Sequence, residues 1–129
     1  MSLIWKLLIV GGGGFLGAIL RYLVGGWVQG LFARPWPYGT FAVNIAGCFA
    51  IGLVWGLVEN RDLLNPAIRL FILTGMLGGF TTFSTFSLET YNLVRQGDWL
   101  GAGLNAGLSV FLGLLAAALA YHLSDPKIV

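Results

Sequence analysis

The residues best suited to chemistry lie in the stretch 75–87, where hydroxyl and phenylalanine side chains follow a run of glycines. Phe83 and Phe86 are three positions apart, so they lie near one face of a helix. Hydroxyl groups lie beside them, at Ser84, Thr85 and Ser87. Hydroxyls can donate hydrogen bonds to a small anion, and the positive edge of an aromatic ring can also face one favourably. The pattern fits a wall that a small anion could follow, although phenylalanines at helical spacing are usually packing residues.

The glycine half of this stretch, Gly78-Gly79-Phe80-Thr81, favours a break in a helix. A break at membrane depth frees backbone carbonyl and amide groups, which must find partners because no water is present there. Freed carbonyls can coordinate a cation such as Na+. If two copies of the chain cross at this break, carbonyls from both could supply one central site. The structural alternative is a kink whose backbone groups bond to threonine hydroxyls.

Other polar residues interrupt apolar runs elsewhere in the chain. Asn44 must bond either to a neighbouring helix or to a polar pathway. Arg21 either snorkels to the lipid headgroups or shapes a polar vestibule. Asn105 and Ser109 are four residues apart and form a polar stripe on an otherwise apolar helix.

The same residue types argue against an enzyme and against a nucleic-acid binder. All the carboxylates lie near predicted helix ends, so we expect no acid–base pair at membrane depth. The seven basic residues are scattered over helix ends rather than clustered, so we expect no nucleic-acid partner. The one cysteine, Cys48, is expected to be a small packing residue.

The elements that must position these side chains are membrane helices. Of 129 residues, 57% are hydrophobic and 9% are charged, whereas soluble domains carry about 25% charged residues. One crossing needs about 20 mainly apolar residues, so the sequence predicts a single all-α domain, residues 1–129, with four transmembrane helices. The expected spans are 3–27, 41–58, a broken third span, and 99–122. Thr40 is the expected N-cap of the second span, and the third begins at Asn65-Pro66, breaks, and resumes near Ser87.

Charge does not fix the orientation strongly. With a cytoplasmic N-terminus, four basic residues fall inside and three outside: Lys6, Arg61, Arg69 and Lys127 against Arg21, Arg34 and Arg95. So weak a positive-inside bias permits insertion in both directions. An antiparallel homodimer with dual topology follows as a hypothesis, and four short helices that enclose little interior of their own also favour it.

Three separated motifs give the chain a family resemblance. They are Gly78 to Ser87, Gly39 to Asn44, and Gly13 to Tyr22. In these motifs, their order, the chain length and the number of spans, the chain resembles the Fluc (CrcB) family of microbial fluoride channels. The resemblance covers essentially the whole sequence.

The resemblance implies a fluoride-selective channel of the cell (inner) membrane that exports cytoplasmic F− passively. It also implies an antiparallel homodimer with two pores and a structural Na+ at the interface, held by backbone carbonyls of Gly78 and Thr81. Asn44, Phe83 and Phe86 would line the fluoride path. Further hydroxyls on that path would come from Thr40, Ser84, Thr85 and Ser109. Arg21 would stabilise the vestibule or the subunit interface.

Two other classes of protein remain as alternatives. A small dual-topology multidrug-type exporter would need a glutamate deep in its first span, and the sequence has none there. A small membrane-assembly subunit would use the glycines for packing alone and would transport nothing.

Overall fold

The computed structural model describes residues 1–61 and 64–124, and every regular element in these residues is helical. The elements are α1 (Leu3–Gly30), α2 (Tyr38–Arg61), α3 (Pro66–Arg69), the π-helix η1 (Leu70–Leu77), α4 (Gly78–Phe80), α5 (Phe83–Arg95) and α6 (Trp99–Leu123). They form four segments that are long and apolar enough to cross a membrane, the third running from Pro66 to Arg95. The predicted all-α membrane fold with a broken third span is confirmed. Lys127, one of the charges used for orientation, lies outside the described residues, as does the side chain of Arg61.

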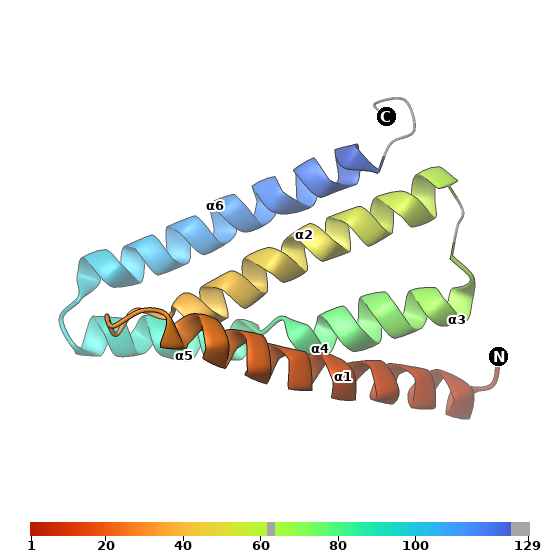
Figure 1. Cartoon of the computed structure of the whole chain (residues 1–129), viewed down its shortest axis with the longest axis horizontal. Coiled ribbons are helices and arrows are strands. Elements are labelled where there is room, and N and C mark those ends of the chain that lie inside the picture. Colours follow the sequence, from red (N-terminus) through yellow and green to blue (C-terminus); the bar gives the residue numbers. More distant parts are fainter. Residues whose placement is uncertain (62–63, 125–129) are drawn as a thin grey trace.

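The helices associate as two pairs. Helix α6 lies along α2, and α1 lies along the third span (Figure 1). The pairs come together around α5, which contacts α6, and they spread apart toward α3 (Figure 1). The broken segment therefore lies where the two pairs meet.

Glycines allow the backbones of these helices to approach closely. A Cβ added at Gly79 would lie 2.6 Å from the Gly14 carbonyl oxygen, and one added at Gly17 would collide with the Met76 carbonyl. The contact between α1 and α2 is equally close, because a Cβ at Gly39 would collide with the Gly25 carbonyl. Small residues at such crossings are how membrane helices maximise packing.

The glycines of helix α2 make close contacts with two neighbouring elements. A Cβ at Gly52 would meet the Ala117 carbonyl of α6, and one at Gly56 would meet Ser124 at the end of α6. Gly47 instead faces Thr81 at the break. The glycines of α2 thus allow both α6 and the third span to pack closely against this helix.

Local sequence sets most of the helix ends. The Asn65 side chain accepts a hydrogen bond from the Ile68 amide at 2.9 Å, with Pro66 in the first turn, so the predicted start of the third span is confirmed. Asp98 caps α6 through the Gly101 amide at 2.8 Å, and Gly97 makes the preceding turn with a φ of 81°.

The prediction that Thr40 caps the second span is wrong. Helix α2 begins at Tyr38, three residues before the expected first helical residue, Phe41. A side chain from another helix supplies the cap, because Gln29 accepts a hydrogen bond from the Gly39 amide at 3.0 Å while donating to the Trp36 carbonyl at 3.0 Å. Thr40 is therefore free to use its hydroxyl elsewhere. The second span also continues past its predicted end to Arg61.

The break is shorter than predicted and begins later. Gly78 and Gly79 are helical, and only Thr81 and Thr82 have extended backbones before α5 begins at Phe83 rather than near Ser87. The glycines serve the close contact with α1, whereas Thr82 ends the interruption by capping α5 through the Thr85 amide. The π-helical turns of η1 just before the break were not predicted.

Candidate functional site

Asn44 clamps the broken segment from the neighbouring helix. Its Oδ1 accepts a hydrogen bond from the Thr82 amide at 2.8 Å, and its Nδ2 donates to the Thr82 carbonyl at 3.1 Å. Both polar backbone groups of Thr82 are thereby satisfied by one side chain on α2. Because an amide side chain carries two N–H donors, Asn44 keeps one for another partner.

The hydrogen bonds of Asn44 also change the bonding of the Gly78 carbonyl at the break. In a continuous α-helix the Thr82 amide would donate to the Gly78 carbonyl. That amide donates instead to Asn44, so the Gly78 carbonyl loses its usual helical partner. Gly78 is exposed on the surface of the chain.

Hydroxyl groups cluster immediately after the break. The Thr82 hydroxyl donates to Thr85 Oγ1 at 3.0 Å, accepts from the Thr85 amide at 3.3 Å, and lies 3.4 Å from Ser84 Oγ. Ser87, by contrast, donates to the Phe83 carbonyl within α5 at 2.9 Å. Thr82 is thus the centre of the hydroxyl cluster.

A pocket of about 350 Å³ opens beside the break. It collects six of the candidate site residues predicted from the sequence, namely Asn44, Gly78, Thr81, Phe83, Phe86 and Ser109. The Phe83 and Phe86 rings form one wall, with centroids 5.5 Å apart and planes tilted by 38°. Phe83 is 79% exposed, so this wall is open on its outer side.

Ser109 contributes an unbonded hydroxyl to this pocket. Its Oγ is buried and has no hydrogen-bond partner among the described residues. Asn105, its neighbour on the predicted stripe, is 1% exposed and donates to Thr90 Oγ1 at 2.8 Å. Thr90 in turn donates to the Phe86 carbonyl at 2.7 Å. One residue of the stripe therefore fastens α6 to α5, and the other faces the pocket.

A second, more polar pocket of about 540 Å³ lies between α1, α2 and α5. Arg21, Thr40 and Thr85 line it together with Glu89, and Thr82 lines both pockets. The two sets of predicted residues therefore meet at Thr82. Ser84 lies outside the described lining of both pockets and is exposed.

Glu89 is the residue of this site that sequence reasoning missed. Its Oε1 accepts a hydrogen bond from the Thr40 hydroxyl at 3.0 Å, and its buried Oε2 has no partner in the part of the chain that the structure describes. The prediction placed all carboxylates near helix ends, but α5 begins at Phe83 and leaves Glu89 well inside the helix. The signal was available, because Glu89 is four residues after Thr85 and so shares its face.

The donors available to a metal ion are limited. Residues 1–61 and 64–124 contain no group of three or more His, Cys, Asp or Glu side chains that could hold one. The carbonyl oxygens released at the break fit a hard cation, which prefers oxygen ligands. The donor set at Gly78 and Thr81 is thus compatible with Na+.

Comparison with known proteins gives consistent matches along the chain. Residues 8–121 match the family model described as CrcB-like protein, Camphor Resistance (CrcB). A relative from Nitratidesulfovibrio vulgaris named "Fluoride-specific ion channel FluC" is 47% identical over 109 residues, covering 84% of this chain and 88% of the relative. Relatives of the same name from Maridesulfovibrio salexigens (49% over 108 residues; 84% and 86% covered) and Chloroflexus aurantiacus (46% over 112 residues; 86% and 88% covered) are similarly close. The chain, with its four membrane-spanning helices and clamped break, belongs to the CrcB family.

Proposed function

We propose that this chain is a fluoride-selective ion channel that lets F− leave the cytoplasm down its electrochemical gradient. The observation that carries the proposal is the pocket at the break, where two aromatic rings share the lining with the unpartnered Ser109 hydroxyl and with Asn44, which has a second N–H to donate. The name carried by relatives 46–49% identical supports fluoride as the ion. The protein acts as a channel in the membrane rather than as an enzyme.

The pocket's chemistry suits a small anion that must shed its water. Hydroxyl and amide donors replace lost hydration bonds, and ring edges add a favourable quadrupole contact. Asn44, Phe83, Phe86 and Ser109 form this part of the proposed path. Ser84 and Thr85 continue it along the hydroxyl cluster past Thr82, and Thr40 extends it into the second pocket. Arg21, in the polar pocket, raises the local concentration of anions at the vestibule.

The proposed assembly is an antiparallel homodimer with two pores. The wall formed by Phe83 is open on its outer side, and a second copy laid against it would close the path. The weak charge bias of the sequence supports insertion in both orientations.

Na+ is proposed as a structural ion at the dimer interface. Backbone carbonyls of Gly78 and Thr81 from both subunits would hold it. The support is the diversion of the Thr82 amide to Asn44, which releases the Gly78 carbonyl on an exposed part of the chain. The ion would join the two breaks electrostatically and takes no part in moving fluoride.

The direct test uses purified protein in liposomes loaded with potassium fluoride, with a fluoride electrode outside. Valinomycin provides the countercurrent of K+. We expect rapid fluoride efflux, and no comparable chloride efflux from matched potassium chloride liposomes followed with a chloride electrode. Absence of fluoride efflux, with the protein shown to be folded and reconstituted, would refute the channel. Proton-coupled uptake of a cationic drug in the same vesicles would point to the exporter class instead.

A further inference from the structure

A separate groove of about 520 Å³ lies where the loop between α1 and α2 meets the start of α6. Trp36 forms its side wall and is fixed there by a hydrogen bond from Nε1 to the Gly101 carbonyl at 3.0 Å. Its ring contacts those of Tyr38 and Phe41, with centroids 4.8 and 5.2 Å away. Because this loop joins two membrane spans, the groove begins at the depth of the lipid headgroups, where aromatic residues concentrate.

The floor of the groove is a leucine stripe on α6. Leu100, Leu104 and Leu108 are spaced four residues apart and are 75%, 45% and 38% exposed, so the stripe becomes more enclosed away from the surface. Eight residues of helix measure about 12 Å, which is most of one leaflet of a hydrocarbon core roughly 30 Å thick. The length of the stripe and its apolar side chains fit the upper part of a lipid acyl chain.

Two opposite charges stand at the mouth of this apolar groove. Arg34 and Asp98 both line it, yet no ion pair joins them in the described structure. Asp98 directs Oδ1 to the Gly101 amide as a helix cap, and its other oxygen can accept from a ligand. A cation and an anion that share one groove without pairing complement a ligand that carries both charges.

We propose that this groove is a specific binding site for one phosphatidylethanolamine molecule. The phosphodiester bonds to the Arg34 guanidinium, the primary ammonium bonds to the Asp98 carboxylate, and one acyl chain lies along the leucine stripe against Trp36. An anionic lipid would leave the Asp98 charge unmatched, and phosphatidylcholine has no N–H to donate to it. The site is separate from the ion path, so its existence does not depend on the proposed transport activity.

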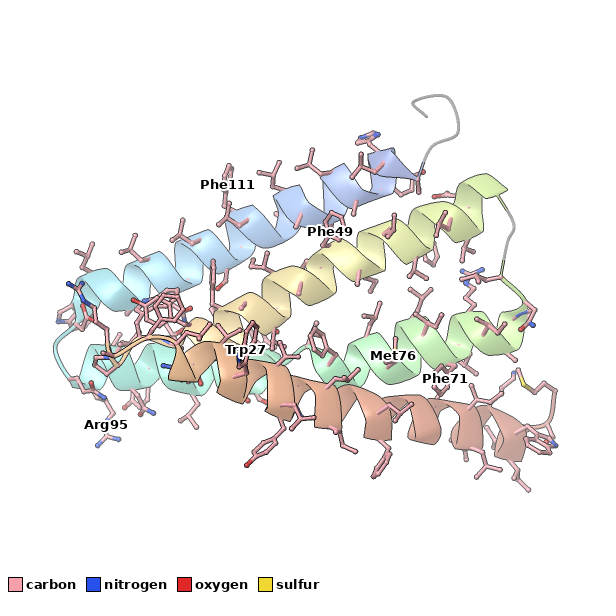
Figure 2. The ribbon with its side chains drawn as sticks, in the orientation of Figure 1. Trp27, Phe49, Phe71, Met76, Arg95 and Phe111 are labelled. Carbon is pink, nitrogen blue, oxygen red and sulfur yellow. The ribbon has the colours of Figure 1, made fainter. Side chains whose placement is uncertain are left out.

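The test is native mass spectrometry of the full-length protein, released from micelles containing equal amounts of phosphatidylethanolamine, phosphatidylglycerol and phosphatidylcholine. We expect wild-type protein to retain one phosphatidylethanolamine per chain in preference to the other two lipids. Arg34→Gln should lower that retention roughly tenfold, the value of one charge-assisted hydrogen bond. Arg95→Gln is the matched control. Arg95 lies at the end of α5, at the same end of the molecule as the groove, but its side chain points outward and does not line the groove (Figure 2).

Two further variants separate headgroup from acyl-chain recognition. Asp98→Asn keeps a good N-cap residue while removing the charge, so it should abolish the preference for phosphatidylethanolamine over phosphatidylcholine. Leu104→Trp fills the groove and should lower retention of all three lipids. Should that variant fail to fold, the two surface variants at the mouth decide the question alone.

Three results would overturn the proposal. One is equal phosphatidylethanolamine retention by wild type and Arg34→Gln, and another is a preference for phosphatidylglycerol. The third is efficient cross-linking between copies of a Leu104→Cys variant in membranes without lipid retention, which would make a second copy the occupant of the groove.

Discussion

Asn44 shows how one side chain can serve both the structure and the proposed path. It satisfies the two backbone groups of Thr82 and still lines the pocket with an N–H to spare. A residue that only lined the path could be replaced by another donor. Asn44 cannot, because an amide is needed to donate and accept at the same peptide unit.

Replacing Asn44 with Asp should therefore abolish most fluoride flux. The carboxylate would face the Thr82 carbonyl without a donor, and its negative charge would repel an anion in a medium of low dielectric constant. Efflux from liposomes measures the effect. Asn65→Asp is the matched control, since it makes the same substitution at the far end of the third span and preserves the cap on α3. Wild-type flux through Asn44→Asp would remove this residue from the path.

Phe83 and Phe86 are predicted to matter through their rings rather than their size. Isoleucine at either position keeps an apolar side chain but removes the quadrupole, so fluoride flux should fall roughly fivefold, the effect of losing about one kcal/mol of aromatic interaction. Phe111→Ile is the comparison, because Phe111 is 65% exposed and stands on the outer side of α6 (Figure 2). Equal flux in all three variants would exclude an aromatic wall.

At the scale of elements, the third span explains both the success and the failure of sequence reasoning. The apolar runs predicted four spans, and the Asn65-Pro66 pair predicted the start of the third. The stretch of glycines and threonines located the break within a few residues. The sequence did not reveal that the break falls at Thr81 and Thr82 or that Glu89 bonds to Thr40, because these depend on contacts between residues 38 and 49 positions apart. Such contacts leave no local pattern.

The glycine contact between α1 and the third span gives a prediction about stability. Gly79→Ala should lower the free energy of unfolding by about 1–3 kcal/mol, because its Cβ would force the Gly14 backbone away. Gly103→Ala should have no such cost and should gain a few tenths of a kcal/mol to about 1 kcal/mol, since no atom outside the helix lies within 4 Å of its Cβ. Thermal unfolding in detergent distinguishes them, and equal destabilisation would contradict the close contact.

The polar stripe on α6 should separate into a structural and a transport residue. Asn105→Ala removes the buried hydrogen bond to Thr90 and should cost about 1–3 kcal/mol of stability. Ser109→Ala loses no hydrogen bond within the described chain, so its stability should be unchanged while fluoride flux falls. Unfolding temperatures and efflux rates measured on both variants check the assignment. A Ser109→Ala protein with full flux would place Ser109 in the packing alone.

At the scale of the whole molecule, the open aromatic wall makes one chain an incomplete path. We expect fusion proteins whose orientation is locked by an added span to be inactive when expressed singly, in either direction. Co-expression of the two orientations should restore fluoride efflux from cells. Activity from one locked orientation alone would rule out the antiparallel dimer.

Gln29 has a consequence for the order in which the protein assembles. It bonds to the loop at Trp36 and to the first turn of α2 at Gly39, beside the close contact of Gly25 with Gly39. Trp36 and Gly39 lie within ten residues of Gln29, and Gly25 and Gly39 are fewer than twenty residues apart in the sequence. Because all these contacts are local, the first two helices can close as a hairpin early in synthesis, before the third span has left the ribosome. Asn44 is then already in place on the folded hairpin when the third span is made, and the break folds against it.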